Sequence, residues 1–337
     1  MLIATPNLCL DITVRLPKLV PGAVVRATAT DTSAGGKGVN VARAAASLGA
    51  PVLLAGFLAA GDGDRLTFLL AGEGLALRAV DVPGVTRVAS ILLEDDGRVT
   101  VINGGGPQID YGQWTAFQNL VADTVIGADL LVCSGSLSPG LPVEAYRVLT
   151  EIAHQAGVPV IVDAAPEVLR HALKARPDLV CPNLSEAEGL LFDRSDEIVD
   201  ERGDDIPARA VRAARALHQA GAVRAVVTAG GSGAGLATAD GTWWLAAPPI
   251  SVVNPVGAGD SFAAGAGFAL VSGASDLDVV RRGMAAASAS CELPTAGRLL
   301  SARAQELFRL VVAVPAELTE KIDGATTSGE FDSGAGE

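Results

Sequence analysis

The chain is poor in basic residues for its length. Its 337 residues include 25 Lys and Arg against 38 Asp and Glu, for a formal net charge of −13. A nucleic-acid partner would require a basic face, so this charge argues against one. An acidic protein can bind phosphates only where local cations and backbone N–H groups overcome the overall field, which directs attention to Lys and Arg residues beside glycines.

Cysteine and histidine are scarce as well, with four and three residues. The cysteines show no C-x-x-C spacing, and the histidines have no partners at metal-ligand spacing, which argues against a zinc site. We expect the thiols to be buried as small apolar side chains. The four cysteines are Cys9, Cys133, Cys181 and Cys291.

Long apolar runs and a basic N-terminal segment are also missing. No stretch reaches the roughly 18 apolar residues that a membrane-spanning helix needs. The opening M-L-I-A-T-P-N lacks the basic region of a secretory signal peptide. We therefore expect a cytoplasmic protein with no membrane partner.

Helical patterns alternate with short apolar runs along most of the chain. The amphipathic segment 142–157 ends at Gly157 and is followed by V-P-V-I-V-D at 158–163. The same order recurs at 206–221 and 223–231. This alternation predicts βαβ units and a mostly parallel sheet covered by helices on both faces.

Two Asp-Gly pairs interrupt this rhythm. Asp96-Gly97 lies between β-like runs within 90–103, and Asp240-Gly241 lies between two more within 235–246. Asp-Gly in this setting predicts a β-hairpin. Together with runs at 10–14 and 24–30, the first hairpin predicts a small separate sheet, with strands within about 10–30 and 86–103, that acts as a lid or an interface.

The lid strands suggest a homodimer formed through the lid. The chain length suits one large α/β domain, which we place at residues 1–315. The small, polar and acidic residues near the C-terminus predict a disordered acidic tail at 316–337.

The most informative stretch is N-P-V-G-A-G-D-S at 254–261, which opens the uncharged run 262–271. A helix this apolar must be buried, and its first N–H groups then have no solvent to bind. Gly257 and Gly259 would let a ligand approach the backbone, so this helix start is a candidate anion site. Simple capping by Asp260 and Ser261 explains the spacing equally well.

A second glycine-rich loop, A-G-G-K-G-V-N-V-A-R-A at 34–44, enters a helix without the spacing of a P-loop. Lys37 would supply a cation beside flexible backbone, and Asn40 can both donate and accept hydrogen bonds. The alternative is a flexible turn with a solvated lysine.

Two further motifs suggest a nucleotide-binding site, at 228–235, and a metal site, at 181–188. T-A-G-G-S-G-A-G at 228–235 is followed by a hairpin rather than a helix, which argues against an NAD site and favours contacts to a nucleotide's phosphates or ribose. In C-P-N-L-S-E-A-E at 181–188, Asn183 and Glu186 can face one ligand, a set that suits hydrated Mg²⁺. A capping pair of Ser185 with Glu188 is the alternative.

In their order along the chain, 34–44, 181–188, 228–235 and 254–261, the four motifs resemble the PfkB, or ribokinase-like, carbohydrate kinase family, over about residues 1–312. The sugar-phosphate branch, with 1-phosphofructokinases and tagatose-6-phosphate kinases, is the most similar. The resemblance includes T-P-N-L-C-L-D at 5–11, T-V-I-N-G-G-G-P at 100–107 and S-G-S-L-S-P-G at 134–140. The sequence departs from that branch at Ala89, Gly104 and Cys181, which leaves the substrate open.

The resemblance implies a ribokinase-like α/β fold with a small β-sheet lid, and an enzyme that uses ATP and Mg²⁺ to phosphorylate a ketohexose phosphate. Fructose 1-phosphate, converted to fructose 1,6-bisphosphate, is the expected substrate. Asp260 would be the general base, and an ordinary pKa of about 4 would keep it ionised. The anion hole would comprise Gly257, Ala258 and Gly259. The substrate would contact Asp11, Gly36, Lys37, Asn40 and Arg87, with Lys37 and Arg87 as the cations for its phosphate. The nucleotide would contact Asn183, Thr228, Gly230 and Gly233, and Glu186 with Asn183 would hold Mg²⁺ through water.

Several alternatives remain. The enzyme could act on tagatose 6-phosphate or fructose 6-phosphate, or on an unphosphorylated sugar or nucleoside. A non-catalytic sugar-phosphate-binding regulator is a third class, but such a protein needs no base at Asp260. Lys37 and Arg87, with Arg26, favour a phosphorylated substrate, because two or three cations near one pocket suit a phosphate.

Overall fold

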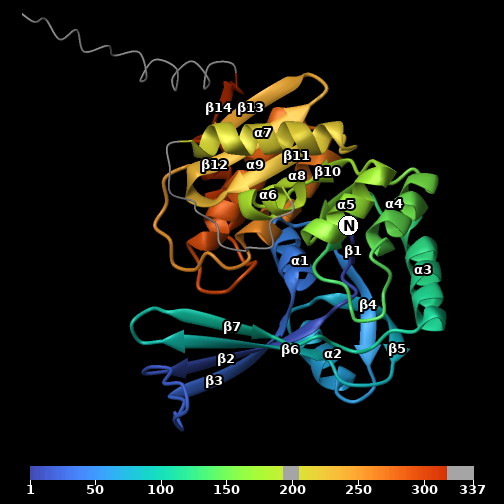
Figure 1. The fold of residues 1–337 in the computed structure, drawn as a ribbon, viewed down its shortest axis with the longest axis vertical. Coiled ribbons are helices and arrows are strands. Elements are labelled where there is room, and N and C mark those ends of the chain that lie inside the picture. Colours follow the sequence, from blue (N-terminus) through green and yellow to red (C-terminus); the bar gives the residue numbers. More distant parts are fainter. Residues whose placement is uncertain (193–204, 317–337) are drawn as a thin grey trace, which may run out of the picture.

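The computed structural model describes residues 1–192 and 205–316, so the expected tail lies, apart from Ala316, outside the described residues. Within them, ten strands form one central sheet in the order β14-β13-β12-β11-β10-β9-β8-β1-β4-β5 (Figure 1). In that order the strands are Val312–Pro315, Gly241–Ala246, Gly233–Thr238, Ala225–Ala229, Leu179–Val180, Val160–Asp163, Leu131–Ser134, Leu2–Ala4, Leu53–Ala59 and Ala76–Val82.

The sheet is parallel from β11 to β5 and antiparallel from β11 to β14. The expected mostly parallel sheet is therefore confirmed. Residues 158–163 contribute β9, whose four residues are all buried, because helices cover both faces of the sheet. The second Asp-Gly pair does form a hairpin, in which Thr238 of β12 pairs with Gly241 of β13.

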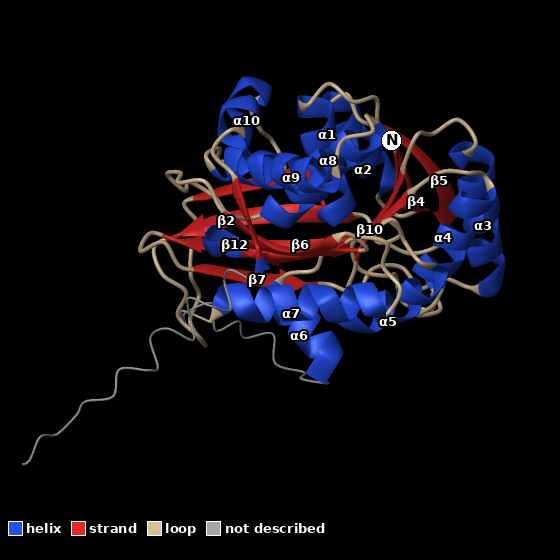
Figure 2. Cartoon of the chain, turned by 90° about the horizontal axis from the view of Figure 1, so that it is seen from above, coloured by secondary structure: helices blue, strands red, loops and turns tan. Residues whose placement is uncertain are grey.

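Helices cover the two faces of the sheet in two groups (Figure 2). Each group has its own core, with Leu66, Phe262 and Leu307 on one face and Phe117, Tyr146 and Leu217 on the other. In the described residues no helix is long and apolar enough to cross a membrane. The first group comprises α1 (Lys37–Ser47), α2 (Gly63–Gly72), α8 (Ala258–Val271), α9 (Asp276–Cys291) and α10 (Ser301–Phe308). The second comprises α3 (Tyr111–Val125), α4 (Ala145–Gln155), α5 (Pro166–Ala172), α6 (Leu184–Phe192) and α7 (Ile206–Gln219).

A small second sheet projects from this body (Figure 1). Its order is β3-β2-β6-β7, with β2 at Cys9–Leu16, β3 at Ala29–Gly35, β6 at Arg87–Glu94 and β7 at Val99–Asn103. The expected separate sheet is thus present, and we call it the lid.

One lid strand differs from the expectation, because β3 begins at Ala29 instead of filling 24–30. Its pairing with β2 runs from Arg15 opposite Ala29 to Cys9 opposite Gly35. The register brings the Asp11 carboxyl over Gly35, where a Cβ atom would lie only 2.1 Å from the Asp11 carboxyl carbon. A side chain at position 35 would clash with Asp11, so only a glycine there allows β3 to pair with β2 in this register.

The parallel strands bring their carboxyl ends to one edge of the sheet, where open α/β sheets bind ligands. Asp163 ends β9, and Asn183 follows β10 and bridges to Thr228 of β11. The loop 135–138 follows β8 at the same edge. Residues distant in sequence are thereby placed around one site.

Candidate active site

The start of α8 is open, although the helix itself is buried. Residues 260–267 are buried, as the uncharged sequence predicts. Gly257 precedes the helix with φ 81°, a left-handed conformation that favours glycine. A Cβ at Gly259 would meet nothing within 4 Å, so there is space for a ligand beside the first turn. The Ala258 N–H donates to the Pro255 carbonyl oxygen and the Ser261 N–H to the Gly257 carbonyl oxygen, which leaves the Gly259 N–H without a backbone partner among the described residues.

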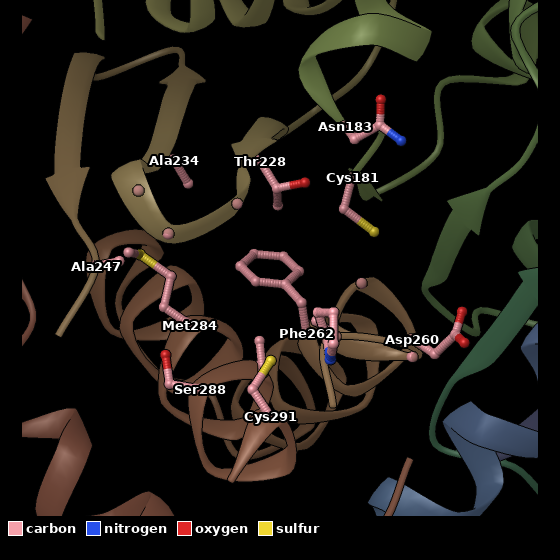
Figure 3. Close-up of a pocket in the computed structure, with 18 of the residues that line it drawn as sticks. Cys181, Asn183, Thr228, Ala234, Ala247, Asp260, Phe262, Met284, Ser288 and Cys291 are labelled. Carbon is pink, nitrogen blue, oxygen red and sulfur yellow. The ribbon is translucent and has the colours of Figure 1, made fainter. Parts of the chain in front are cut away.

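A cavity of about 840 Å³ begins at this helix start. Figure 3 shows Asp260 toward one end of it and Met284 and Ala247 toward the other, with Thr228 and Cys181 between. One end of the cavity is therefore charged and the other apolar. The cavity brings together ten residues that the sequence singles out, namely Lys37, Asn183, Glu186, Thr228, Gly230, Gly233, Gly257, Ala258, Gly259 and Asp260.

The ordinary pKa expected for Asp260 is wrong. The carboxyl is only 5% exposed. Burial, and then the negative charges of Asp163 and Glu186, raise its pKa from 3.8 to about 7, while Lys37 and a hydrogen bond from Asn40 act in the opposite direction. The helix start helps a nearby anion, but it does not offset the loss of water around a buried carboxylate.

Lys37 lies between two carboxylates at the charged end. Its Nζ is 3.3 Å from Asp163 Oδ1 and 3.5 Å from Glu186 Oε1. The charge of Asp163, and then that of Glu186, raises the pKa of Lys37 against the effect of its desolvation. The ammonium is therefore a permanent cation beside Asp260, at the end of the cavity where negative charge would otherwise accumulate.

Asn183 and Glu186 bind each other at the start of α6. The Glu186 N–H donates to Asn183 Oδ1 over 2.8 Å, and the Asn183 N–H donates to Glu186 Oε2 over 3.0 Å. This is a capping box, and it corrects the alternative pairing of Ser185 with Glu188. Glu188 instead binds Arg209. Glu186 Oε1 still faces the cavity beside Lys37, so capping and ligand contact use different oxygens.

The turn after β11 forms the middle of the cavity wall. Gly230 has φ 52° and Gly233 has φ 143°. A Cβ at Gly233 would lie 2.1 Å from the Leu245 carbonyl oxygen, so the hairpin closes onto the turn only with glycine there. The turn leaves backbone exposed to the cavity next to Thr228.

Four of the substrate-side residues lie outside the lining of this cavity. Asn40 Nδ2 donates to Asp260 Oδ2 over 2.8 Å, so it lies directly behind the carboxylate. Asp11 lies on lid strand β2, where burial raises its pKa. Gly36 precedes α1 with φ 95°.

Arg87, the fourth of these residues, lies at the start of lid strand β6. Its Nη1 donates to Ser136 Oγ over 3.0 Å and its Nη2 to Asn103 Oδ1 over 2.7 Å. Its buried Nε has no hydrogen-bond partner among the described residues. Lys37 and Arg87 therefore lie on either side of the loop 135–138, because Gly135 is next to Lys37 while Ser136 binds Arg87.

Sequence reasoning overlooked Asp163 and the apolar end of the cavity. Asp163 is 4% exposed and lines the cavity as the partner of Lys37. The sequence could have indicated Asp163, because it is an acidic residue at the end of the apolar run V-I-V-D and therefore at the carboxyl end of a predicted strand. The apolar end is formed by segment 247–250 with Met284 and Ala287, which meet only in the folded chain. In the described part of the chain, no group of three or more His, Cys, Asp and Glu could hold a metal directly.

Known proteins match nearly the whole chain. Residues 4–303 match the family model of the pfkB family carbohydrate kinases. A 1-phosphofructokinase of Escherichia coli (strain K12) is 32% identical over 285 residues, which cover 84% of this chain and 88% of the relative.

Solved structures agree with this assignment. E. coli phosphofructokinase-2 in complex with fructose-6-phosphate matches with a TM-score of 0.80 at 28% identity, covering 92% of this chain and 98% of that one. Arabidopsis thaliana ribokinase complexed with ribose and ATP matches with a TM-score of 0.70 at 24% identity, covering 91% and 98%, and shows the fold alone. The ribokinase-like fold is thus confirmed. With nearly its whole length matched, the chain belongs to the pfkB family of carbohydrate kinases and is an ATP-dependent sugar kinase.

Proposed function

We propose that the enzyme transfers the γ-phosphoryl group of ATP to the free terminal hydroxyl of fructose 1-phosphate, with Asp260 as the general base. The observation that carries this proposal is the position of Asp260, a buried carboxylate at the open start of α8, in a cavity that is charged at one end and apolar at the other. The 1-phosphofructokinase relative supports the choice of substrate.

ATP fits the cavity along its length. The apolar end, with Met284 and Ala287, suits the base, and the glycine turn before β12 suits the ribose and phosphates. The γ-phosphoryl group then lies against the first turn of α8, where Gly257 and Gly259 offer backbone N–H groups to the charge that develops in transfer. Ala258, the third residue expected in the anion hole, donates its N–H to the Pro255 carbonyl oxygen over 3.2 Å and would have to release it to join them.

Proton and phosphoryl transfer follow from this arrangement. As the substrate oxygen bonds to phosphorus, Asp260 accepts the hydroxyl proton, and the bond to the β–γ bridging oxygen breaks to release ADP. Lys37, beside Asp163, is positioned to neutralise charge on the transferring group.

The residues at the start of α6 fit a hydrated Mg²⁺. Glu186 is 25% exposed, and its Oε1 faces the cavity while its other oxygen is held by the Asn183 N–H. Such an ion keeps several waters and needs only one or two carboxylates, so Glu186 would hold it through water while Asn183 fixes Glu186. When bound, Mg²⁺ offsets the repulsion between the nucleotide phosphates and the carboxylates.

The sugar phosphate fits between the lid and α1. Asp11 lies over Gly35, and Gly36 directly precedes Lys37 at the start of α1. The Arg87 guanidinium has a buried N–H without a partner among the described residues. Arginine binds phosphate through paired N–H groups, so Arg87 is our proposed ligand of the substrate phosphate. Asn40 already donates to the Asp260 carboxylate, so it could contact only a sugar hydroxyl that lies next to Asp260.

Fructose 6-phosphate is a second candidate, because the E. coli phosphofructokinase-2 neighbour was solved with it. The test is a panel assay of ADP release from Mg-ATP with fructose 1-phosphate, fructose 6-phosphate, tagatose 6-phosphate and the unphosphorylated sugars. We expect the highest kcat/KM with fructose 1-phosphate. A preference for an unphosphorylated sugar would contradict the proposal.

The phosphate contact is tested by Arg87→Ala. We expect a rise of about tenfold or more in KM for the sugar phosphate and little change in KM for ATP, since one charge-assisted pair is lost. Arg65→Ala is the matched control, because Arg65 binds Thr32 on the protein surface. Equal changes in both KM values would show that Arg87 does not bind the phosphate.

We also propose that residues 1–315 form one kinase domain that pairs with a second copy through the lid. The two helix layers share one sheet, which supports a single domain. The lid exposes apolar side chains on one face of β7, where Val99 is 50% and Val101 48% exposed. A second lid would cover these side chains.

A further inference from the structure

Arg43 is a buried arginine behind the candidate active site. It lies on α1 and is 6% exposed. Its Nε and Nη2 both donate to Glu73 over 2.6 Å, and Nη2 also donates to the Ala34 carbonyl oxygen over 2.5 Å. The remaining nitrogen, Nη1, donates to Asn40 Oδ1 over 3.0 Å. All three nitrogens of the Arg43 guanidinium are therefore hydrogen-bonded, and one of these bonds goes to the Asn40 side chain.

That contact determines which way the Asn40 amide faces. Asn40 accepts from Arg43 through Oδ1, so its NH₂ group points to Asp260, where Nδ2 donates to Oδ2 over 2.8 Å. The reversed amide would place NH₂ against the guanidinium and oxygen against the carboxylate. Both contacts would be repulsive, because an arginine only donates and an ionised carboxylate only accepts.

We propose that Arg43 is a positioning residue of the reaction: held by Glu73, it fixes the Asn40 amide so that Asn40 donates to the carboxylate of Asp260. The inference rests on the proposed role of Asp260 as the base. Lysine could not replace Arg43, because a single ammonium lacks the planar fork that binds Glu73 in two places and Asn40 at the same time.

The loop 296–298 makes further contacts with Glu73 and Asn40. Arg298 Nη2 lies 3.4 Å from Glu73 Oε2, so Glu73 joins this loop to Arg43. A Cβ at Gly297 would lie 2.6 Å from the Asn40 carbonyl oxygen, so the loop packs closely on the backbone of Asn40. Arg43 thus holds the side chain of Asn40, and the loop at Gly297 packs on its backbone. Glu73 links the two contacts, because it binds both Arg43 and Arg298.

The contact has a consequence for the base itself. Asp260 is faced by Lys37 from α1, by Asp163 from the end of β9 and by Glu186 from α6. Among the described side chains, Lys37 and the Asn40 hydrogen bond favour its ionised form. Loss of Arg43 lets the Asn40 amide turn away, which raises the pKa of Asp260 and moves the acid limb of activity to higher pH.

The test is the pH profile of kcat/KM for Arg43→Met. We expect the acid midpoint to rise by about one pH unit, the size of one lost hydrogen bond to a carboxylate, so that kcat/KM at pH 7 falls about fivefold and recovers in alkaline solution. The substrate phosphate titrates identically in both proteins, so the difference belongs to the enzyme. A lower rate at every pH with an unchanged midpoint would overturn the proposal, because it would show a purely structural role.

Three further variants complete the design. In an Asn40→Ala background, Arg43→Met should cause no additional shift, and a further shift would show that Arg43 does not act through Asn40. Arg43→Lys keeps a buried charge beside Glu73 and should shift the midpoint in the same direction if Arg43→Met does not fold. Arg303→Gln is the matched control, since Arg303 binds Glu292 with the same two-bond geometry, and it should leave the profile unchanged.

Failure of the proposed function would look different. If Asp260→Asn retained full activity, the base would be another group and the wild-type midpoint would not belong to Asp260. If Asp260→Asn is inactive while Arg43→Met has the wild-type midpoint, only the positioning role of Arg43 is wrong.

Discussion

The surroundings of Asp260 disfavour the ionised form of its carboxyl group. Burial and the neighbouring carboxylates raise its pKa to about 7. A base must be ionised to accept a proton, so activity should be present above pH 7 and lost as the pH falls through that value. We expect kcat/KM to show an acid limb with a midpoint near 7. A limb only near pH 4 would mean that Asp260 is not the titrating base.

The same residue links activity to stability. Because the folded-state pKa is raised from 3.8 to about 7, the native protein binds this proton more tightly than the unfolded chain, so stability falls as the pH rises from about 4 to about 7 and stays lower above that range. Asp260→Asn should therefore lower kcat by about 10²- to 10⁴-fold and raise the melting temperature more at pH 8 than at pH 5. ADP release and thermal melts measure the two effects.

Asp278→Asn is the matched control for that variant. It removes a first-turn carboxylate from α9, where Asp278 binds Arg281 at the half-exposed helix surface. Activity should stay at the wild-type level, and no rise in melting temperature specific to pH 8 is expected. A comparable loss of activity in both variants would contradict a special role for Asp260.

At the scale of the element, the open start of α8 depends on Gly257. Its φ of 81° disfavours any side chain, and a Cβ would lie 3.0 Å from the Gly297 nitrogen. Gly257→Ala should cost about 1 kcal/mol or more of stability and also lower kcat, because it shifts the N–H groups that face the phosphoryl group.

Gly273, just after the other end of α8, separates these two effects. It has φ 71°, and a Cβ there would meet nothing within 4 Å, so Gly273→Ala brings the same backbone strain without a clash. We expect a similar fall in melting temperature with unchanged kcat. Equal kcat values in the two variants would show that the start of α8 does not contribute to transfer.

At the scale of the whole molecule, the lid should join two copies of the chain. Val101→Lys places a charge in the exposed apolar part of β7 and should convert a dimer to a monomer in light scattering. Ile126→Lys, at a 75% exposed site after α3, should leave the dimer intact. A monomeric wild-type protein at micromolar concentration would show that the proposed lid interface is wrong.

Sequence patterns predicted the architecture because each depends on near neighbours. The continuous apolar run at 158–163 predicted a strand that helices cover on both faces. Asp240-Gly241 predicted a hairpin turn, because this residue pair favours the backbone conformation of such a turn. The start of the second lid strand, β3, was misplaced, because its register depends on the fit of Asp11 over Gly35. Those residues are 24 positions apart in the sequence.

The candidate site shows the same division. The glycine motifs at 34–44 and 254–261 carry local requirements, namely left-handed φ values and helix starts, and the sequence alone predicts an anion site at the second of these helix starts. Only the tertiary structure decided that Asp260 is faced by Asp163 and Glu186 and held by Asn40, and hence that its pKa is near 7. Charge interactions and desolvation depend on distance in space, and the carboxyl ends of parallel strands bring together side chains that are far apart in the chain.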